Sequence, residues 1–289
     1  MMKNKTQLHL QTHKKMKKII ISIFLLILLV GCSSNPQGKG SGTPDGLHIS
    51  FLEFQPRDEL KQNEYFDIGL KLENRAECLI KGEICVRDTL AESISGVRNS
   101  CQSFELREKE DNIVDSENIY FIDNAYQSAV GDLKSTVIAK ARYSCSIQLT
   151  PQLCVKPNLE DENACRIKET LQSSAVGLKS APITVTSIDK TLIPQRDNIN
   201  LEVAIHLRKM SEGVPEDFNI NVEYEGYGPL NCRNIDRLNF KTNTENIINC
   251  DIPINVQDIE ENPLKITLNY VYETQQSKQI KIIKEGDTI

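Results

Sequence analysis

The sequence predicts an all-β protein built from antiparallel strands. Three observations support this class. After residue 46, apolar residues alternate with polar ones in nearly every ordered segment, and turn-forming pairs separate these segments. No long stretch repeats its apolar residues every 3.6 positions. Strict alternation gives a strand one buried and one solvated face, which is typical of the antiparallel sheets of β-sandwiches.

Four segments show the alternation most clearly, with an apolar residue at every second position: 66–72, 137–149, 199–207 and 264–272. Turn-forming pairs such as Lys81-Gly82, Glu212-Gly213 and Asn262-Pro263 lie between the alternating segments. We therefore expect each segment to form a strand that ends at a polar turn.

We expect two β-sandwich domains in tandem. Residues 181–188 have the pattern of a closing strand, and the polar run Asp189-Lys190-Thr191, then Pro194, precedes a new alternating strand. The predicted domains are therefore 47–187, which is rich in cysteine, and 188–285.

The second domain contains the segments ITVTSIDKTLI, NINLEVAIHL, PLKITLNYVYE and QIKIIK. These segments resemble the immunoglobulin-like adhesion modules of archaeal and bacterial surface proteins, and the resemblance covers Ala181–Lys284. It implies immunoglobulin-like sandwiches with an interaction or spacing role rather than chemistry. Two features differ from the pattern: 209–213 replaces the usual Asn-x-Gly turn, and the chain has no tryptophan.

A short apolar segment precedes the predicted domains. Ile19–Val30 contains Ser22 as its only polar residue, and four lysines flank its N-terminal side: Lys14, Lys15, Lys17 and Lys18. A membrane-spanning helix needs about 20 apolar residues, so this segment is too short to span comfortably. A positive flank before a short apolar core is typical of a signal peptide, which we predict over 1–31, with Met16 as an alternative start.

The motif Leu29-Val30-Gly31-Cys32 follows and resembles the lipobox of prokaryotic lipoproteins at all four positions. The resemblance implies that a diacylglycerol is attached to Cys32 and that the chain is cut before it. The mature protein would then be lipid-anchored to a membrane of the cell envelope, at the extracytoplasmic face. A plain secretory signal or an uncleaved anchor is the alternative. Residues 32–46 are mostly Gly, Ser, Pro and polar side chains, so we expect a flexible linker.

Eight of the nine cysteines remain when Cys32 is set aside. An even number in an exported chain is typical of a disulfide framework, although eight cysteines allow 105 pairings. Proximity favours three pairs and leaves a fourth by subtraction: Cys85–Cys101, Cys154–Cys165, Cys232–Cys250 and Cys78–Cys145. A zinc site is the weaker alternative, because no C-x-x-C occurs. A free thiol at Cys78 is another.

Composition and motifs disfavour several function classes. The net charge of −6 argues against a nucleic-acid partner, which would need a concentrated basic surface. No nucleophile elbow, zincin, phosphate-loop or dinucleotide-binding motif occurs. His48 follows the linker, and His206 lies on the predicted solvated face of a strand. We therefore predict no catalytic residues, no cofactor and no metal, with a calcium site at 160–162 as a weaker alternative.

Tyr224 and Tyr227 are the candidate binding residues. They flank Gly226 in the segment YEGYGP, and aromatic rings on a Gly-rich loop can stack on sugars or anchor a protein contact. The other interpretation, which we favour, is a core tyrosine beside a turn.

These observations predict a lipid-anchored surface protein that acts as a non-enzymatic binding, adhesion or structural module. Its expected partners are the membrane, through the lipid, and a protein or glycan at the cell exterior. One alternative is a lipid-anchored hydrolase with paired carboxylates, which would need a cleft with two close carboxyl groups and a raised pKa. The other is a subunit of a larger envelope assembly.

Overall fold

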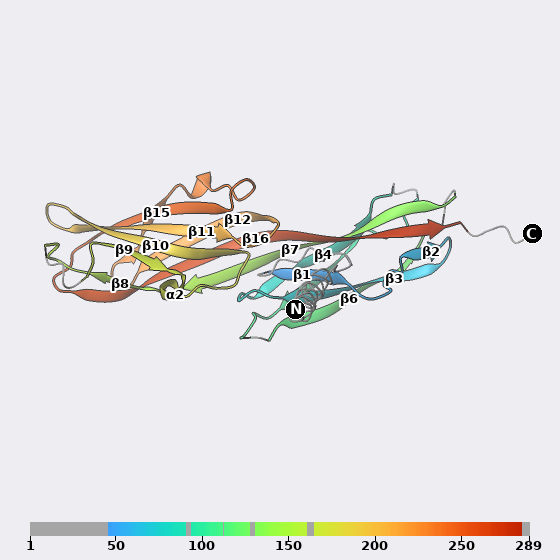
Figure 1. Cartoon of the computed structure of the whole chain (residues 1–289), viewed down its shortest axis with the longest axis horizontal. Helices are drawn as coiled ribbons and strands as arrows, with labels where there is room; N and C mark the ends of the chain where they lie inside the picture. The colour runs from blue at the N-terminus through green and yellow to red at the C-terminus, as the bar shows by residue number, and fades with distance from the viewer. Residues whose placement is uncertain (1–45, 91–93, 112, 128–130, 161–164, 285–289) are drawn as a thin grey trace, which may run out of the picture. The chain divides into compact units, whose positions relative to one another are not determined.

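The computed structural model describes residues 46–90, 94–111, 113–127, 131–160 and 165–284, all of which belong to one unit of the chain, 40–289. The predicted signal peptide, Cys32 and nearly all of the linker lie outside the described residues. Strands make up most of the described chain, and they form three sheets (Figure 1). All named strand pairs are antiparallel except the short pair β2–β16. The predicted all-β antiparallel class is confirmed.

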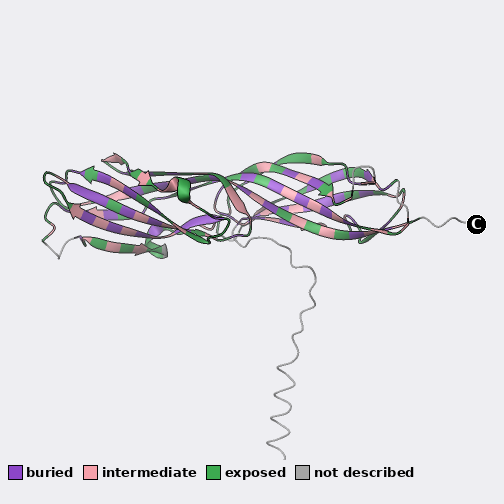
Figure 2. Cartoon of the chain, turned by 90° about the horizontal axis from the view of Figure 1, so that it is seen from above, coloured by how far each residue is buried: buried purple, intermediate pink, exposed green. Residues whose placement is uncertain are grey.

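The largest sheet has eight strands, in the order β13-β12-β16-β7-β4-β5, with β2 and β8 also paired to β16. Their bounds are β2 Glu59–Lys61, β4 Ile80–Asp88, β5 Ser100–Leu106, β7 Leu133–Leu149, β8 Gln152–Val155, β12 Val214–Tyr224, β13 Gly228–Pro229 and β16 Glu260–Ile283. Buried and more exposed residues alternate along many of the strands (Figure 2). In β7 the buried residues fall at every second position from Ser135 on, as the alternation predicted.

A second sheet has five strands in the order β14-β15-β11-β10-β9, and a third has three in the order β1-β3-β6. The strands of the second are β9 Lys168–Gln172, β10 Ile183–Pro194, β11 Ile199–Lys209, β14 Asn231–Arg233 and β15 Glu245–Ile254. Those of the third are β1 Leu47–Phe51, β3 Tyr65–Asn74 and β6 Asp115–Ala125. The short helix α2 spans Ser173–Val176, and a 3-10 turn spans Ile235–Arg237.

The pairing of β7 with β16 runs from Leu133 to Leu149 without a register shift. The sequence divides β16 into two alternating segments, because 273–278 is polar throughout. The structure keeps these residues in the strand, since the backbone of β7 supplies their hydrogen bonds.

The polar run Asp189-Lys190-Thr191 lies inside β10 and does not end a strand, contrary to the prediction. The reason is the side chain of Lys190, which is buried and donates to the backbone oxygen of Cys154 at 2.8 Å. It also pairs with the carboxylate of Glu169 at 2.8 Å. A buried lysine with both partners can occupy an inward position of a strand.

The division into 47–187 and 188–285 stays a prediction. β10 runs continuously across the predicted boundary, and β7 and β16, which come from opposite sides of it, form one ladder.

Three buried tyrosines link elements that are distant in the sequence. The Tyr143 hydroxyl accepts the backbone N–H of Leu47, and that of Tyr270 accepts the N–H of Ile183 at 3.2 Å. The Tyr272 hydroxyl donates to the backbone oxygen of Ser211 at 2.8 Å. Burial raises the pKa of Tyr272 to about 12. Each tyrosine thus fills the core with its ring and satisfies a buried backbone group with its hydroxyl.

The described cysteines form four disulfides, and the pairs are those that sequence proximity and subtraction favour. Cys85–Cys101 and Cys232–Cys250 each join directly opposed residues of neighbouring strands. Cys78–Cys145 instead joins the connection between β3 and β4 to the middle of β7, with both cysteines buried.

We expect the Cys78–Cys145 disulfide to stabilise the fold more than Cys85–Cys101. It closes a sequence separation of 67 residues rather than 16, which corresponds to about 1 kcal/mol of additional loop-closure entropy. The check uses two variants, each with both cysteines of one pair replaced by alanine. Urea unfolding of the two variants compares their stabilities. Equal unfolding midpoints for the two variants would contradict it.

Gly82 should tolerate no larger residue. Gly82 of β4 lies opposite Tyr143 of β7, and a Cβ on it would collide with the carbonyl oxygen of Arg142 and come within 2.7 Å of the Cα of Tyr143. We expect Gly82→Ala to lower the free energy of unfolding by about 2 kcal/mol, because the strands must move apart. Glu83→Ala, at the next position of the strand, is the control, and its urea midpoint should stay near that of the unaltered protein.

Candidate functional site

The solvent-facing side of the five-stranded sheet carries a groove of about 710 Å³. Strand register builds its floor: Ser187 of β10 lies opposite Gln172 of β9 on one side and His206 of β11 on the other. His206 in turn lies opposite Ile247 of β15. Four strands thus contribute one row of side chains across the sheet.

Residues beyond the strand ends close the groove. Leu178 follows α2, Met210 follows β11, and Asn243 precedes β15. The volume lies within the range of about 300–1,000 Å³ that is usual for small-molecule sites.

His206 is held in a fixed orientation beside the groove. Its Nε2 lies 2.8 Å from Oδ2 of Asp189, and the hydroxyl of Thr170 donates to Oδ1 of the same carboxylate at 2.6 Å. The Thr170 hydrogen bond lowers the pKa of Asp189, and the contact with His206 lowers it further against the opposing effect of burial. The sequence places His206 on the solvated face of its strand. In the structure its side chain is 31% exposed, so it is partly covered rather than fully in solvent.

This cluster does not have the order of a catalytic triad. In a triad the nucleophile donates to the imidazole and the carboxylate orients the ring from the other side. Here the hydroxyl of Thr170 donates to Asp189, so the carboxylate stands between the hydroxyl and the ring. The arrangement orients an imidazole and activates no hydroxyl.

The candidate binding residues Tyr224 and Tyr227 are brought together, but as core packing. Tyr224 is fully buried, its ring stacks on that of Tyr227 with centroids 5.4 Å apart, and its hydroxyl donates to the backbone oxygen of Leu153 at 3.0 Å. Tyr227 is half-buried and donates to the carboxylate of Glu260 at 2.8 Å. The binding role considered for Tyr224 is therefore corrected: its ring has no face left for a ligand.

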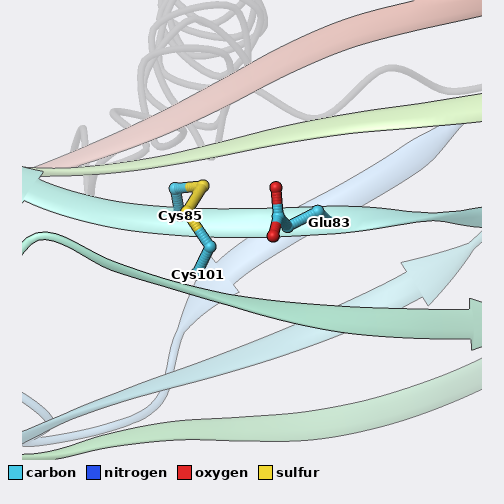
Figure 3. A group of neighbouring side chains, drawn as sticks. All are labelled: Glu83, Cys85 and Cys101. Carbon is cyan, nitrogen blue, oxygen red and sulfur yellow. A yellow bond between two sulfur atoms is a disulfide. The ribbon is translucent and has the colours of Figure 1, made fainter.

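Glu83, Cys85 and Cys101 have ligand-type atoms close enough to surround a cation (Figure 3). The two sulfur atoms are bonded to each other. A disulfide offers no thiolate, and the carboxylate of Glu83 alone does not make a metal site.

His48 lies on β1, in a different sheet from His206. In the strand register it lies opposite Glu73 of β3. Burial, followed by the charge of Arg75, lowers the pKa of His48. The structure thus places the two histidines in separate settings.

Sequence reasoning missed the groove and the roles of Thr170 and Asp189. The sequence shows polar residues at 184–191 and 202–208. Only the register of the four strands shows that polar residues from both segments share one face of the sheet. A signal was present in the outward positions of the predicted strand 199–207, where His206 stands beside Arg208.

None of the helices in the described ranges has the length and apolar character needed to cross a membrane. No protein-family model matches this sequence, and no curated protein matches it either.

Proposed function

We propose that the protein is a lipid-anchored surface protein at the extracytoplasmic face of the cell envelope, and that it acts as a non-enzymatic binding module. Its folded part would consist of two immunoglobulin-like sandwiches in tandem. The four disulfides support an extracytoplasmic location, because such bonds persist in oxidising compartments and are rare in the cytosol. The lipobox-like motif that ends at Cys32 supports the anchor.

The observation that carries the binding role is the groove on the five-stranded sheet. Its walls combine aliphatic side chains with hydroxyl, amide and imidazole groups, a mixture that orients a ligand without reacting with it. The sheet that presents the groove is braced by Cys232–Cys250 and by the buried Lys190. A rigid support of this kind reduces the entropy lost on binding.

The hydrolase alternative gains no support from the carboxyl groups. A general acid needs a raised pKa. Among the described residues, three carboxyls have a pKa that departs from the usual value: Glu73, Asp115 and Asp189. All three shift downward, each through hydrogen bonds from neighbouring groups. A role as subunit of a larger envelope assembly is a variant of the proposal, in which the bound partner is a permanent one.

Mild crosslinking in the native cell, followed by purification of the full chain and identification of what is attached, tests the binding role. A partner that is enriched over a second lipid-anchored protein of the same cell supports the role. Recovery of the chain alone, at crosslinker levels that capture known complexes, contradicts it.

Replacing the lipidated residue should abolish both the acylation and the cut. With Cys32→Ser no thioether can form, so we expect an uncut precursor without acyl chains, measured by intact mass. Two acyl chains contribute about 0.8 kcal/mol per buried CH₂ to anchoring, so any membrane retention of the variant would come from the uncut apolar segment Ile19–Val30. Ser33→Ala is the matched control and should keep both the cut and the anchor. Unchanged mass and retention in the Cys32→Ser variant would refute the lipid anchor.

A further inference from the structure

We propose that the groove on the five-stranded sheet binds a neutral, polyhydroxylated ligand, namely a segment of an uncharged glycan. This inference rests on the proposed binding role and names the ligand class for that same site. The support comes from four features of the groove: its apolar side chains, its neutral hydrogen-bonding groups, its balanced charge and two polar groups without partners.

Three aliphatic side chains around the groove are unusually exposed. Leu178, Met210 and Ile247 are 46%, 37% and 49% exposed, and they come from three separate elements. Exposed large apolar residues that gather in one hollow mark an interaction site more strongly than single ones do. They provide surface for the C–H faces of a ligand.

Neutral hydrogen-bonding groups also line the groove. Gln172 and Asn243 contribute carboxamides and Ser187 a hydroxyl. A carboxamide both donates and accepts, and so does a hydroxyl. Sugar hydroxyls have the same dual character, so this set of groups matches a polyhydroxylated ligand.

The charged groups of the groove are already paired. The guanidinium Nε of Arg208 lies 3.0 Å from the carboxylate of Glu245, and His206 faces the carboxylate of Asp189. A charged ligand would have to compete with these pairs, whereas a neutral one leaves them intact. The charge balance therefore favours a neutral ligand.

Two polar groups in the wall of the groove have no hydrogen-bond partner among the described residues. Thr184 is 1% exposed and its Oγ1 is unpaired. Asn246 accepts the backbone N–H of Asn239 with Oδ1, but its Nδ2 is unpaired. Most buried polar atoms in proteins are hydrogen-bonded, so unpaired ones need an explanation. Both residues line the groove, so a small shift of either side chain would let a hydroxyl-rich ligand become its hydrogen-bond partner.

A peptide fits this site less well. Peptide main chains are commonly recognised by an unpaired strand edge, through backbone hydrogen bonds. β11 is paired on both sides, and β10 is paired with β11 along its length and with β9 from Ser187 to Thr191, so most of their backbone groups are occupied. Recognition on this face therefore relies mainly on side chains.

The test is binding of the full-length protein, kept in a detergent without a sugar headgroup, to an array of neutral and charged oligosaccharides. We expect neutral members to bind, and calorimetric titration then gives the Kd of the best one. Thr184→Val keeps the shape of the side chain and removes the unpaired hydroxyl. It should leave the unliganded protein folded and weaken binding about tenfold, which is the loss of one good hydrogen bond.

A matched pair of surface variants locates the site. Ile247→Asp places a charge in the groove and should reduce affinity at least tenfold, whereas Ile259→Asp, at an equally exposed isoleucine outside the groove, should leave it unchanged. Circular dichroism confirms that both remain folded. No binding to any glycan, binding of charged glycans alone, or equal affinities of the two variants overturns the inference.

The experiments can distinguish a failure of the glycan inference from a failure of the proposed binding role. If crosslinking in the cell captures a protein partner, and Ile247→Asp does not affect the capture, the glycan inference fails while the binding role stands. If neither a glycan nor a cellular partner is found, both fail.

Discussion

The ladder between β7 and β16 is the constraint on which the rest of the structure depends. Every residue of β7 is paired with β16, and β4, β12, β2 and β8 all join the largest sheet through one of these two strands. The close approach of β4 to β7 requires Gly82, and Cys78–Cys145 fixes the preceding connection to the same strand. The inward face of the ladder carries Tyr143, Tyr270 and Tyr272, whose hydroxyls reach out to β1, β10 and the residues after β11.

The five-stranded sheet uses its two faces differently. Its inner face is aliphatic, with Val203, Ile205 and Leu207 almost completely buried. Its outer face holds the groove and the cluster of His206, Asp189 and Thr170. Lys190 is a charged residue on this inner face. Its ammonium group donates hydrogen bonds to Glu169 and to the backbone of β8, which offsets the cost of burying the charge. A polar site of this kind can therefore sit on a well-packed scaffold.

Much of the fold could be predicted from the sequence, because alternation is a local property. The buried positions of β3 and β7 follow directly from the spacing of their apolar residues. Cysteine pairing was accessible for Cys85–Cys101 and Cys232–Cys250, since neighbouring strands bring nearby cysteines opposite each other. Strand order was not accessible, because β7 and β16 are separated by more than a hundred residues of sequence. The groove was missed for the same reason: it exists only when β9, β10, β11 and β15 are aligned.

The position of β16 along the chain has a consequence for how the protein matures. The residues of β16 are made after all the other described strands, yet they supply the centre of the largest sheet. Until they emerge, β12 and β7 lack their shared neighbour and expose apolar faces. Pairings between distant segments also form slowly, because a long loop must close first. Apolar faces that wait for a distant strand are prone to aggregation, so the pairing of β7 with β16 is the step of folding most exposed to it.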